Sequence, residues 1–301
     1  NVNHLTKLEI LDAYGNCGIN DDGIVQCVNL KTLKSSDNRK ITNVNHLAKL
    51  EILNASGYEC GINDTGIVQC VNLKSLNASS NSKITNVNHL ANLEILGASY
   101  ECGINDAGIK QCVNLKSLNA FDNQKITNVN HLANLEILNA YGVCGINDAG
   151  IVQCINLKSL NAPYNTKITN ANHLANLEIL DASSDCGIND AGIIYCINLK
   201  SLNALYNPEI TNVNHLVKLE ILDASDDCGI NDAGIMQCIN LKSLNASSNS
   251  KITNVNHLVN LEILDASGGK CWINDVGIVH CINLKSLKAT NNSKITKKLI
   301  K

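Results

Sequence analysis

The chain consists almost entirely of one repeated segment. NVNHL, or its variant NANHL, begins seven times, at Asn1, Asn43, Asn86, Asn128, Asn170, Asn212 and Asn254. These starts define units of 42 or 43 residues that together cover residues 1–296 and leave a short tail, 297–301. A unit of this size cannot bury its apolar face alone, so neighbouring units must stack. We therefore expect one solenoid over 1–296, followed by a C-terminal tail.

Each unit contains two related halves. The first reads HLANLEILDASSDCGINDAGI at His173 to Ile193, and the second reads CINLKSLNALYNPEIT at Cys196 to Thr211. Both contain L-x-x-L-x-A, whose last apolar residues alternate with polar ones, as in a short strand with one buried face. The halves recur about every 20 or 22 residues, so seven units predict about fourteen turns. We expect Leu180 and Leu202 to lie on the same inner seam of neighbouring turns.

The segment between two strands is expected to be a short helical or irregular return. INDAGIIYC, from Ile188 to Cys196, is an example. Asp190 is a candidate for the helix N-cap, because a carboxylate can accept a hydrogen bond from the exposed N–H groups of the first turn. The predicted strands then stack in parallel on the inner face.

These motifs resemble the leucine-rich-repeat family. L-x-x-L-x-A is followed either by N-x-x-I-T or by C-x-I-N-D, and the first half is similar to the cysteine-containing subclass. The resemblance implies an α/β horseshoe with a parallel sheet on its concave face and short helical, 3-10 or irregular convex segments. Alanine stands where the family usually has a third leucine, which implies a thinner core. The phrase NLKSLNASSNSKIT also resembles repeats in proteins of amoeba-infecting giant viruses of the mimivirus group.

An asparagine recurs at the strand exit of every second half. Its amide can bond the backbone of its own and neighbouring turns where the chain leaves the sheet, so we interpret the whole set as structural. The set is Asn38, Asn81, Asn123, Asn165, Asn207, Asn249 and Asn292.

The fourteen cysteines fall in pairs ten residues apart. The absence of C-x-x-C argues against a zinc or redox motif. We favour reduced, buried thiols that act as small apolar residues, with disulfides inside a turn or between adjacent turns as the alternative. The resemblance places the first cysteine of each pair in a buried structural position at a strand exit: Cys17, Cys60, Cys102, Cys144, Cys186, Cys228 and Cys271.

Histidine and the charged residues also recur regularly. One histidine for every two turns is too sparse for a shared metal site, and we expect neither a metal nor another cofactor. Glutamate follows the first leucine in first halves, as in Glu178, and lysine takes that place in second halves, as in Lys200. Stacking the turns should therefore alternate the two charges along the sheet.

Residues that alternate with the buried positions should face a partner. Aspartate at these positions includes Asp181, Asp223 and Asp265. Sister units otherwise differ most at the strand exits, where large apolar residues replace serine, and exposed aromatics are good interface anchors. The predicted partner-binding residues at these exits are Tyr14, Phe121, Tyr141, Tyr164, Leu205 and Tyr206.

The sequence thus favours a protein-interaction scaffold that binds a protein through its concave face. A net charge of −3 gives no basic field for nucleic acid or for an anionic membrane. No phosphate-binding loop, acid pair or nucleophile motif indicates an enzyme. With no long apolar stretch or secretory signal, we expect a cytoplasmic protein, in a host cell or a virion if the source is viral. The alternatives are an assembly protein that self-associates end to end through uncapped ends, and a substrate receptor of an F-box-type ubiquitin ligase if an N-terminal domain is missing.

Overall fold

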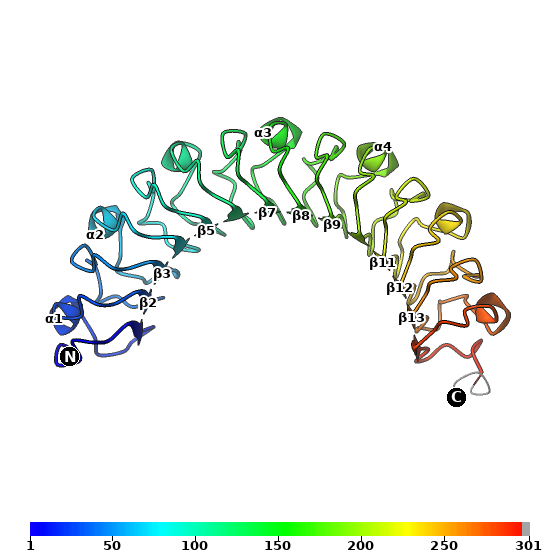
Figure 1. Cartoon of the computed structure of the whole chain (residues 1–301), viewed down its shortest axis with the longest axis horizontal. Helices are drawn as coiled ribbons and strands as arrows, with labels where there is room; N and C mark the ends of the chain where they lie inside the picture. The colour runs from blue at the N-terminus through cyan, green and yellow to red at the C-terminus, as the bar shows by residue number, and fades with distance from the viewer. Residues whose placement is uncertain (297–301) are drawn as a thin grey trace. The chain divides into compact units, whose positions relative to one another are not determined.

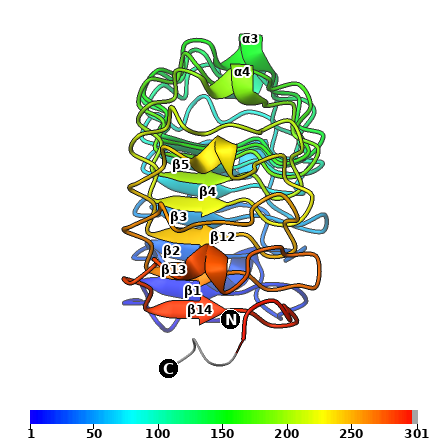
Figure 2. The same cartoon turned by 90° about the vertical axis from the view of Figure 1, so that its right-hand side faces the viewer.

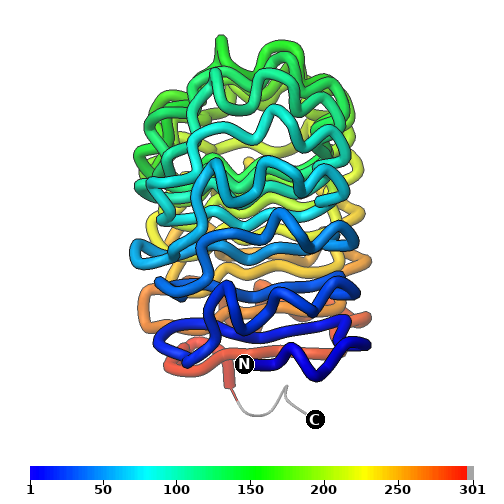
Figure 3. Tube along the Cα trace, turned by 90° about the vertical axis from the view of Figure 1, so that its left-hand side faces the viewer, coloured from blue at the N-terminus to red at the C-terminus, as the bar shows by residue number. Residues whose placement is uncertain are grey.

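The computed structural model describes residues 1–296. The chain forms two compact units, residues 1–154 and residues from 155 onward. The predicted tail, 297–301, lies outside the described residues. Each unit is a coil in which every turn contributes one three-residue strand. Figure 3 shows how successive turns of the first unit, coloured blue to green, lie on one another.

Each unit contributes seven parallel strands. In the first unit these are β1 (Ile10–Asp12), β2 (Thr32–Lys34), β3 (Ile52–Asn54), β4 (Ser75–Asn77), β5 (Ile95–Gly97), β6 (Ser117–Asn119) and β7 (Ile137–Asn139). In the second they are β8 (Ser159–Asn161), β9 (Ile179–Asp181), β10 (Ser201–Asn203), β11 (Ile221–Asp223), β12 (Ser243–Asn245), β13 (Ile263–Asp265) and β14 (Ser286–Lys288). Within a unit each strand pairs in parallel with the next, as Figure 2 shows for β12, β13 and β14.

The core of each unit is a seam formed by the middle residue of every strand. Leu180 pairs directly with Leu202, and each is 1 % exposed. A small residue follows each strand from β1 to β13 and is buried beside this seam; it is Ser35 after β2 and an alanine, such as Ala182, after the others. Because side chains alternate along a strand, the first and third strand residues are left on the opposite, inner face. The predicted fold class, a solenoid with a parallel sheet and short helical returns, is confirmed.

The helical returns lie on the outer side of each unit (Figure 1) and occur once for every two strands. The α-helices are α1 (Asp21–Ile24), α2 (Asp64–Ile67), α3 (Asp148–Ile151) and α4 (Asp190–Ile193). Single 3-10 turns take their place at η1 (Ala107–Ile109), η2 (Ala233–Ile235) and η3 (Val276–Ile278).

The prediction that Asp190 caps helix α4 is wrong. The N-cap is Asn189, which has an extended backbone and whose side chain accepts a hydrogen bond from the Gly192 N–H. Asp190 is the first helical residue, so its carboxylate points to the next turn. There it accepts hydrogen bonds from the Thr211 N–H at 2.7 Å and from the Thr211 hydroxyl at 2.6 Å. Asparagine therefore holds the helix start, while aspartate joins adjacent turns.

The buried asparagines occupy the strand exits and bond mainly backbone; Asn38 also donates to the Cys17 sulfur at 3.4 Å. The Asn81 amide N–H groups donate to the carbonyls of Ala55 at 2.8 Å and Ile62 at 3.0 Å, both in the preceding turn. Its amide oxygen accepts from the Lys83 N–H at 2.9 Å. Equivalent side-chain amides donate to one alanine and one isoleucine carbonyl of the preceding turn at Asn38, Asn123, Asn207, Asn249 and Asn292. Each such side chain supplies partners for backbone groups that the three-residue strands leave unpaired.

The recurring histidines also contact backbone. The His89 Nε2 lies 3.1 Å from the carbonyl oxygen of Ile67 in the preceding turn, which requires the proton on that nitrogen. Equivalent contacts of 3.0 to 3.2 Å are made by His46, His131, His215 and His257. A ring held in this way joins two turns.

All fourteen cysteines are free thiols in the described part of the chain, and thirteen are buried. The prediction of a buried position is wrong for Cys17, which lies in the first turn and is only partly buried. Several donate weak hydrogen bonds to the preceding turn, as Cys196 does to the Ala171 carbonyl at 3.4 Å. Burial raises the pKa of the Cys70, Cys112 and Cys196 thiols from 9.0 to about 11. The proton is therefore held more tightly in the folded chain than in the unfolded chain.

This pKa difference predicts alkaline destabilisation. Below pH 9 both states keep the thiol protons, and the contribution of the thiols to stability is complete. As the pH rises from 9 towards 11, the unfolded chain ionises first, so the free energy of unfolding must fall. Urea denaturation at pH 8 and pH 10 measures this loss, and Cys70→Ala with Cys112→Ala should reduce it. A thiol titration in denaturant that finds far fewer than fourteen free thiols would contradict the reduced state.

Candidate functional site

The inner sheet face of each unit carries a column of half-exposed isoleucines. They occupy the first position of alternate strands, and serine or threonine occupies it on the strands between. In register, Ile179 pairs with Ser201, which pairs with Ile221. The isoleucines are 46 to 65 % exposed: Ile10, Ile52, Ile95 and Ile137 in the first unit, and Ile179, Ile221 and Ile263 in the second.

Sequence reasoning missed these isoleucines. In the segment LEILDA, Ile179 stands between two core leucines and was therefore assigned to the core with them. Adjacent strand residues face opposite sides, however, so Ile179 and Leu180 cannot both be buried in the same core. The alternation that placed Leu180 in the core was the signal that could have found them. A large apolar side chain kept outside the core, at the same place in every first half, is available to contact a partner.

The third strand position forms a second, polar column beside the isoleucines. In the second unit it contains Asp181, Asp223 and Asp265, with Asn203 and Asn245 between them. All three aspartates are partly exposed on the inner face, where the sequence predicted them. Asp265 pairs with Lys288 at 2.9 Å, whereas Asp223 accepts hydrogen bonds from Asn245 at 2.8 Å and from Ser225.

Three aromatic rings contact one another at the strand exits of β5, β6 and β7. The centroids of Tyr100 and Phe121 are 4.7 Å apart, and those of Phe121 and Tyr141 are 4.6 Å apart with the rings edge to face. Such pairs contribute about 0.5–1.5 kcal/mol beyond the area they bury. Of these residues, Phe121 and Tyr141 were predicted and Tyr100 was missed. Tyr14, also predicted, is 68 % exposed and touches no other ring among residues 1–296.

The second unit places Tyr164, Leu205 and Tyr206 at its strand exits. Tyr164 is 50 % exposed, Tyr206 is 48 % exposed, and Leu205 is partly buried. The negative charge of Asp226, and the hydrogen bond between the two side chains, raise the pKa of Tyr206. Tyr206 therefore remains a neutral hydroxyl that presents both a ring face and a polar tip.

Three of these tyrosines occupy strained backbone positions. Every turn leaves its strand through one residue with positive φ, and this residue is glycine in four turns and Asp, Ser or Asn in seven. The other three are Tyr100, Tyr164 and Tyr206, with φ of 59°, 57° and 55°. A left-handed conformation costs a non-glycine residue about 1–2 kcal/mol, and bulky residues rarely adopt it. The fold does not require tyrosine there, and strain retained at exposed positions is typical of functional residues.

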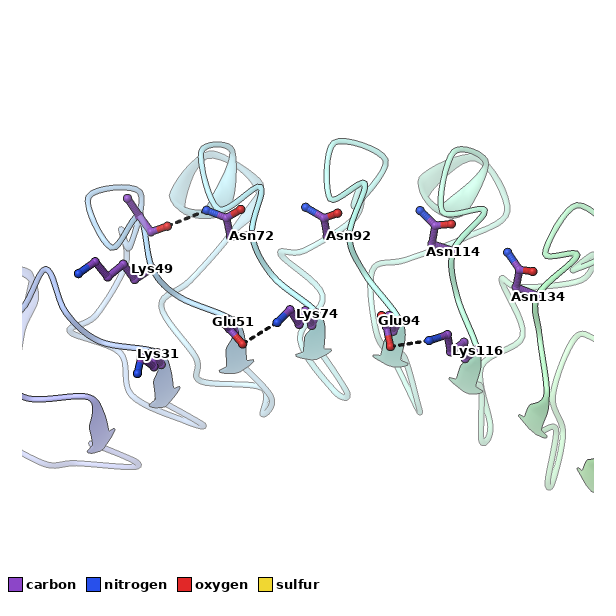
Figure 4. Close-up of a pocket in the computed structure, with 11 residues that line it drawn as sticks. Lys31, Lys49, Glu51, Asn72, Lys74, Asn92, Glu94, Asn114, Lys116 and Asn134 are labelled. Atoms are coloured by element: carbon purple, nitrogen blue, oxygen red, sulfur yellow. Dashed lines mark hydrogen bonds and ion pairs between the residues drawn. The ribbon is translucent and has the colours of Figure 1, made fainter.

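Each unit also has a polar groove at the amino ends of its strands. The groove of the first unit, about 690 Å³ in volume, is drawn in Figure 4, and that of the second is about 670 Å³. One wall is the predicted charge ladder, which is confirmed: Lys74 and Lys200 lie 2.9 Å from Glu51 and Glu178 of the preceding turn. Further ladder pairs are Lys31–Glu9, Lys116–Glu94, Lys242–Glu220 and Lys285–Glu262.

The other wall of the groove is a column of asparagines that sequence reasoning missed. The sequence pattern that could have identified this column is the asparagine that precedes leucine in each VNLK and ANLE segment. Asn72 and Asn114 donate to the carbonyls of Ala48 and Ala91, each at 2.9 Å. The ladder charges are thus paired with one another, and the amide N–H groups of Asn72 and Asn114 are bonded to backbone.

Within residues 1–296, no group of three or more His, Cys, Asp or Glu side chains is placed to hold a metal ion. Over the same residues, no helix combines the length and apolar character that crossing a bilayer needs.

The strained tyrosines predict that a residue better suited to the left-handed conformation will stabilise the fold. Tyr206→Asn places at this position the residue that the chain itself uses at Asn291. Asparagine tolerates the left-handed conformation, so Tm should rise by about 2 °C despite the lost contact with Asp226. Tyr195→Asn is the control, because Tyr195 is 70 % exposed without a positive φ. Differential scanning calorimetry decides, and a lower Tm for Tyr206→Asn than for the control would refute the strain.

Known proteins resemble this chain in backbone fold, but none of the matches identifies its family. The sequence matches no protein-family model and no curated protein. Among solved structures, an internalin of Listeria monocytogenes is 22 % identical, with a TM-score of 0.61 over 98 % of this chain and 84 % of that one. A leucine-rich-repeat protein of Leptospira interrogans is 19 % identical, with a TM-score of 0.52 over 92 % of this chain and 88 % of that one.

A third similar structure is TLR13 in its complex with ssRNA13. It is 22 % identical, with a TM-score of 0.58, and the match covers 97 % of this chain but only 48 % of that one. At these identities the likeness concerns the path of the backbone alone. Together with the parallel three-residue strands and their buried leucine seam, it shows that this chain has the leucine-rich-repeat fold.

Proposed function

We propose that this chain is a recognition scaffold that binds partner proteins through the inner sheet face and the strand exits of its units. The observation that carries the proposal is the cluster of Tyr100, Phe121 and Tyr141 on the exit edge of a regular sheet, in which the Phe121 ring contacts the other two rings. Aromatic side chains dominate the energetics of protein interfaces. A rigid scaffold that holds them in place loses little conformational entropy on binding.

The rest of the inner face supports the same use. The half-exposed isoleucines extend the apolar surface along the strands, and Tyr164 and Tyr206 remain at positions where they strain the backbone. We therefore keep the predicted partner-binding residues as the proposed interface and add two features. The additions are Tyr100 and the isoleucine column, while Tyr14 stands outside the ring cluster.

The charge of the inner face argues against nucleic acid as the partner. Binding to phosphates needs a surplus of lysine and arginine on the contact surface. Here the polar column of the second unit is acidic, and six ladder lysines are paired with glutamates. Although a similarly folded structure holds ssRNA, we propose a protein partner for this chain. A viral source, a cytoplasmic location, the lack of enzymatic activity and the two alternative roles stay predictions.

The proposal predicts that capture of partners depends on the ring cluster. The full chain, immobilised and exposed to an extract of its source cells, should retain a set of proteins identified by quantitative mass spectrometry. Tyr100→Ala, Phe121→Ala and Tyr141→Ala together should reduce their recovery about tenfold or more, the effect of losing about 1.4 kcal/mol of binding free energy. A photo-crosslinking residue at position 121 should label the same proteins.

Tyr195→Ala serves as the matched control, because this exposed tyrosine follows helix α4 on the outer side. It should leave recovery unchanged, and a crosslinker at position 195 should not label the captured proteins. Thermal unfolding of each variant shows that its fold is intact. Equal recovery by the triple variant and the wild type would refute the proposed binding surface.

A further inference from the structure

The inner face of the second unit repeats with a period of two strands. Ile179, Ile221 and Ile263 stand at the first position of β9, β11 and β13, each 50 or 51 % exposed. Asp181 and Asp223 stand at the third position of β9 and β11, and Asp265 follows on β13. Because the first and third positions face the same side, an apolar and an acidic column run next to each other across the strands.

The acidic column has charge left for a partner. Neither Asp181 nor Asp223 has an ion-pair partner within residues 1–296. The lysines of the following turns, Lys200 and Lys242, are paired with glutamates at the amino edge of the strands. Exposed carboxylates at the strand exits, such as Asp227, add to the negative charge.

The first unit provides an internal comparison. Its isoleucine column is the same, but the corresponding polar positions are Asn54, Gly97 and Asn139, and Asp12 is paired with Lys34 at 3.5 Å. The apolar column is therefore a property of both units, whereas the unpaired carboxylates belong to the second unit alone. A ligand that recognises this difference must be cationic.

The distance between aspartates two strands apart indicates which conformation of the ligand fits. Strands lie about 4.8 Å apart, so residues two strands apart are about 9.6 Å apart. A polyproline II segment advances about 3.1 Å per residue, so every third side chain returns to the same face after about 9.3 Å. In an α-helix two turns span about 10.8 Å, and the mismatch exceeds 1 Å at each step. An extended segment running across the strands therefore keeps register with the aspartates.

We propose that the second unit binds an extended, basic segment of a partner protein with lysine or arginine at every third residue. The cationic groups contact Asp181 and Asp223, and the residues between them lie against Ile179, Ile221 and Ile263. This assignment rests on the proposed recognition function and names its partner chemistry. Proline between the cationic residues favours binding, because it fixes the extended conformation before contact is made.

The test uses the full chain and synthetic peptides labelled for fluorescence anisotropy. A peptide of repeated Lys-Pro-Pro triplets should bind at least about tenfold more tightly than one with the same number of lysines at every fourth residue. Its affinity should fall as salt is added, since the contacts are ionic and exposed. A lysine-rich helical peptide of equal charge tests the rival conformation and should bind more weakly.

The matched variants separate this face from general electrostatics. Asp181→Asn with Asp223→Asn introduces the residue that the first unit uses at Asn54 and Asn139, so folding should be preserved, and affinity for the triplet peptide should fall about tenfold. The control, Asp22→Asn with Glu101→Gln, removes two exposed charges from the first unit and should change affinity less than about twofold.

Two outcomes overturn the inference. One is equal binding of the triplet peptide and the fourth-residue or helical peptide, and the other is unchanged affinity of the Asp181 and Asp223 variant. Either result leaves the proposed function intact if the ring-cluster variant still loses its captured proteins. Conversely, triplet binding with no effect of the ring-cluster variant would support this face and refute the wider binding surface.

Discussion

Burial of one leucine and one small residue per turn, alanine in nearly every turn, against the next turn is the interaction on which everything else in this chain depends. A three-residue strand has too few hydrogen bonds to persist alone, and the seam of Leu180, Leu202 and Leu222 exists only when turns stack. The buried asparagines, the histidine contacts and the aspartate contacts to the next turn supply partners for the backbone between strands. Once the turns are stacked in this register, the alternation along each strand places the isoleucine and polar columns on the inner sheet face.

This register explains which parts of the structure the sequence could predict. The period of the repeat and the alternation in L-x-A gave the strands, their parallel pairing, the buried seam and the charge ladder, because each depends on spacing along the chain alone. The helix cap was assigned to Asp190 instead of Asn189 because both residues can cap. Only the backbone angles show which of the two precedes the helix.

The functional surface was harder to predict for a different reason. Contact between Tyr100 and Phe121 links residues in adjacent turns, and single-sequence reasoning that compared sister units overlooked Tyr100 because its neighbours resemble those of other copies. The strain at Tyr164 and Tyr206 is invisible until φ is known. The isoleucine column was present in the alternation itself, but apolar residues beside leucines were assumed to belong to the core.

The central claim is that Leu202 holds the turns together while Ile221, on the neighbouring strand, is displayed to a partner. Urea denaturation of Leu202→Ala and Ile221→Ser measures this directly. Leu202 is 1 % exposed, so its truncation should lower the free energy of unfolding by about 2–5 kcal/mol. Ile221 is 51 % exposed, and serine fills that position in the adjacent strands, so its loss should cost less than about 0.5 kcal/mol. Equal losses, or a larger loss for Ile221→Ser, would contradict the account.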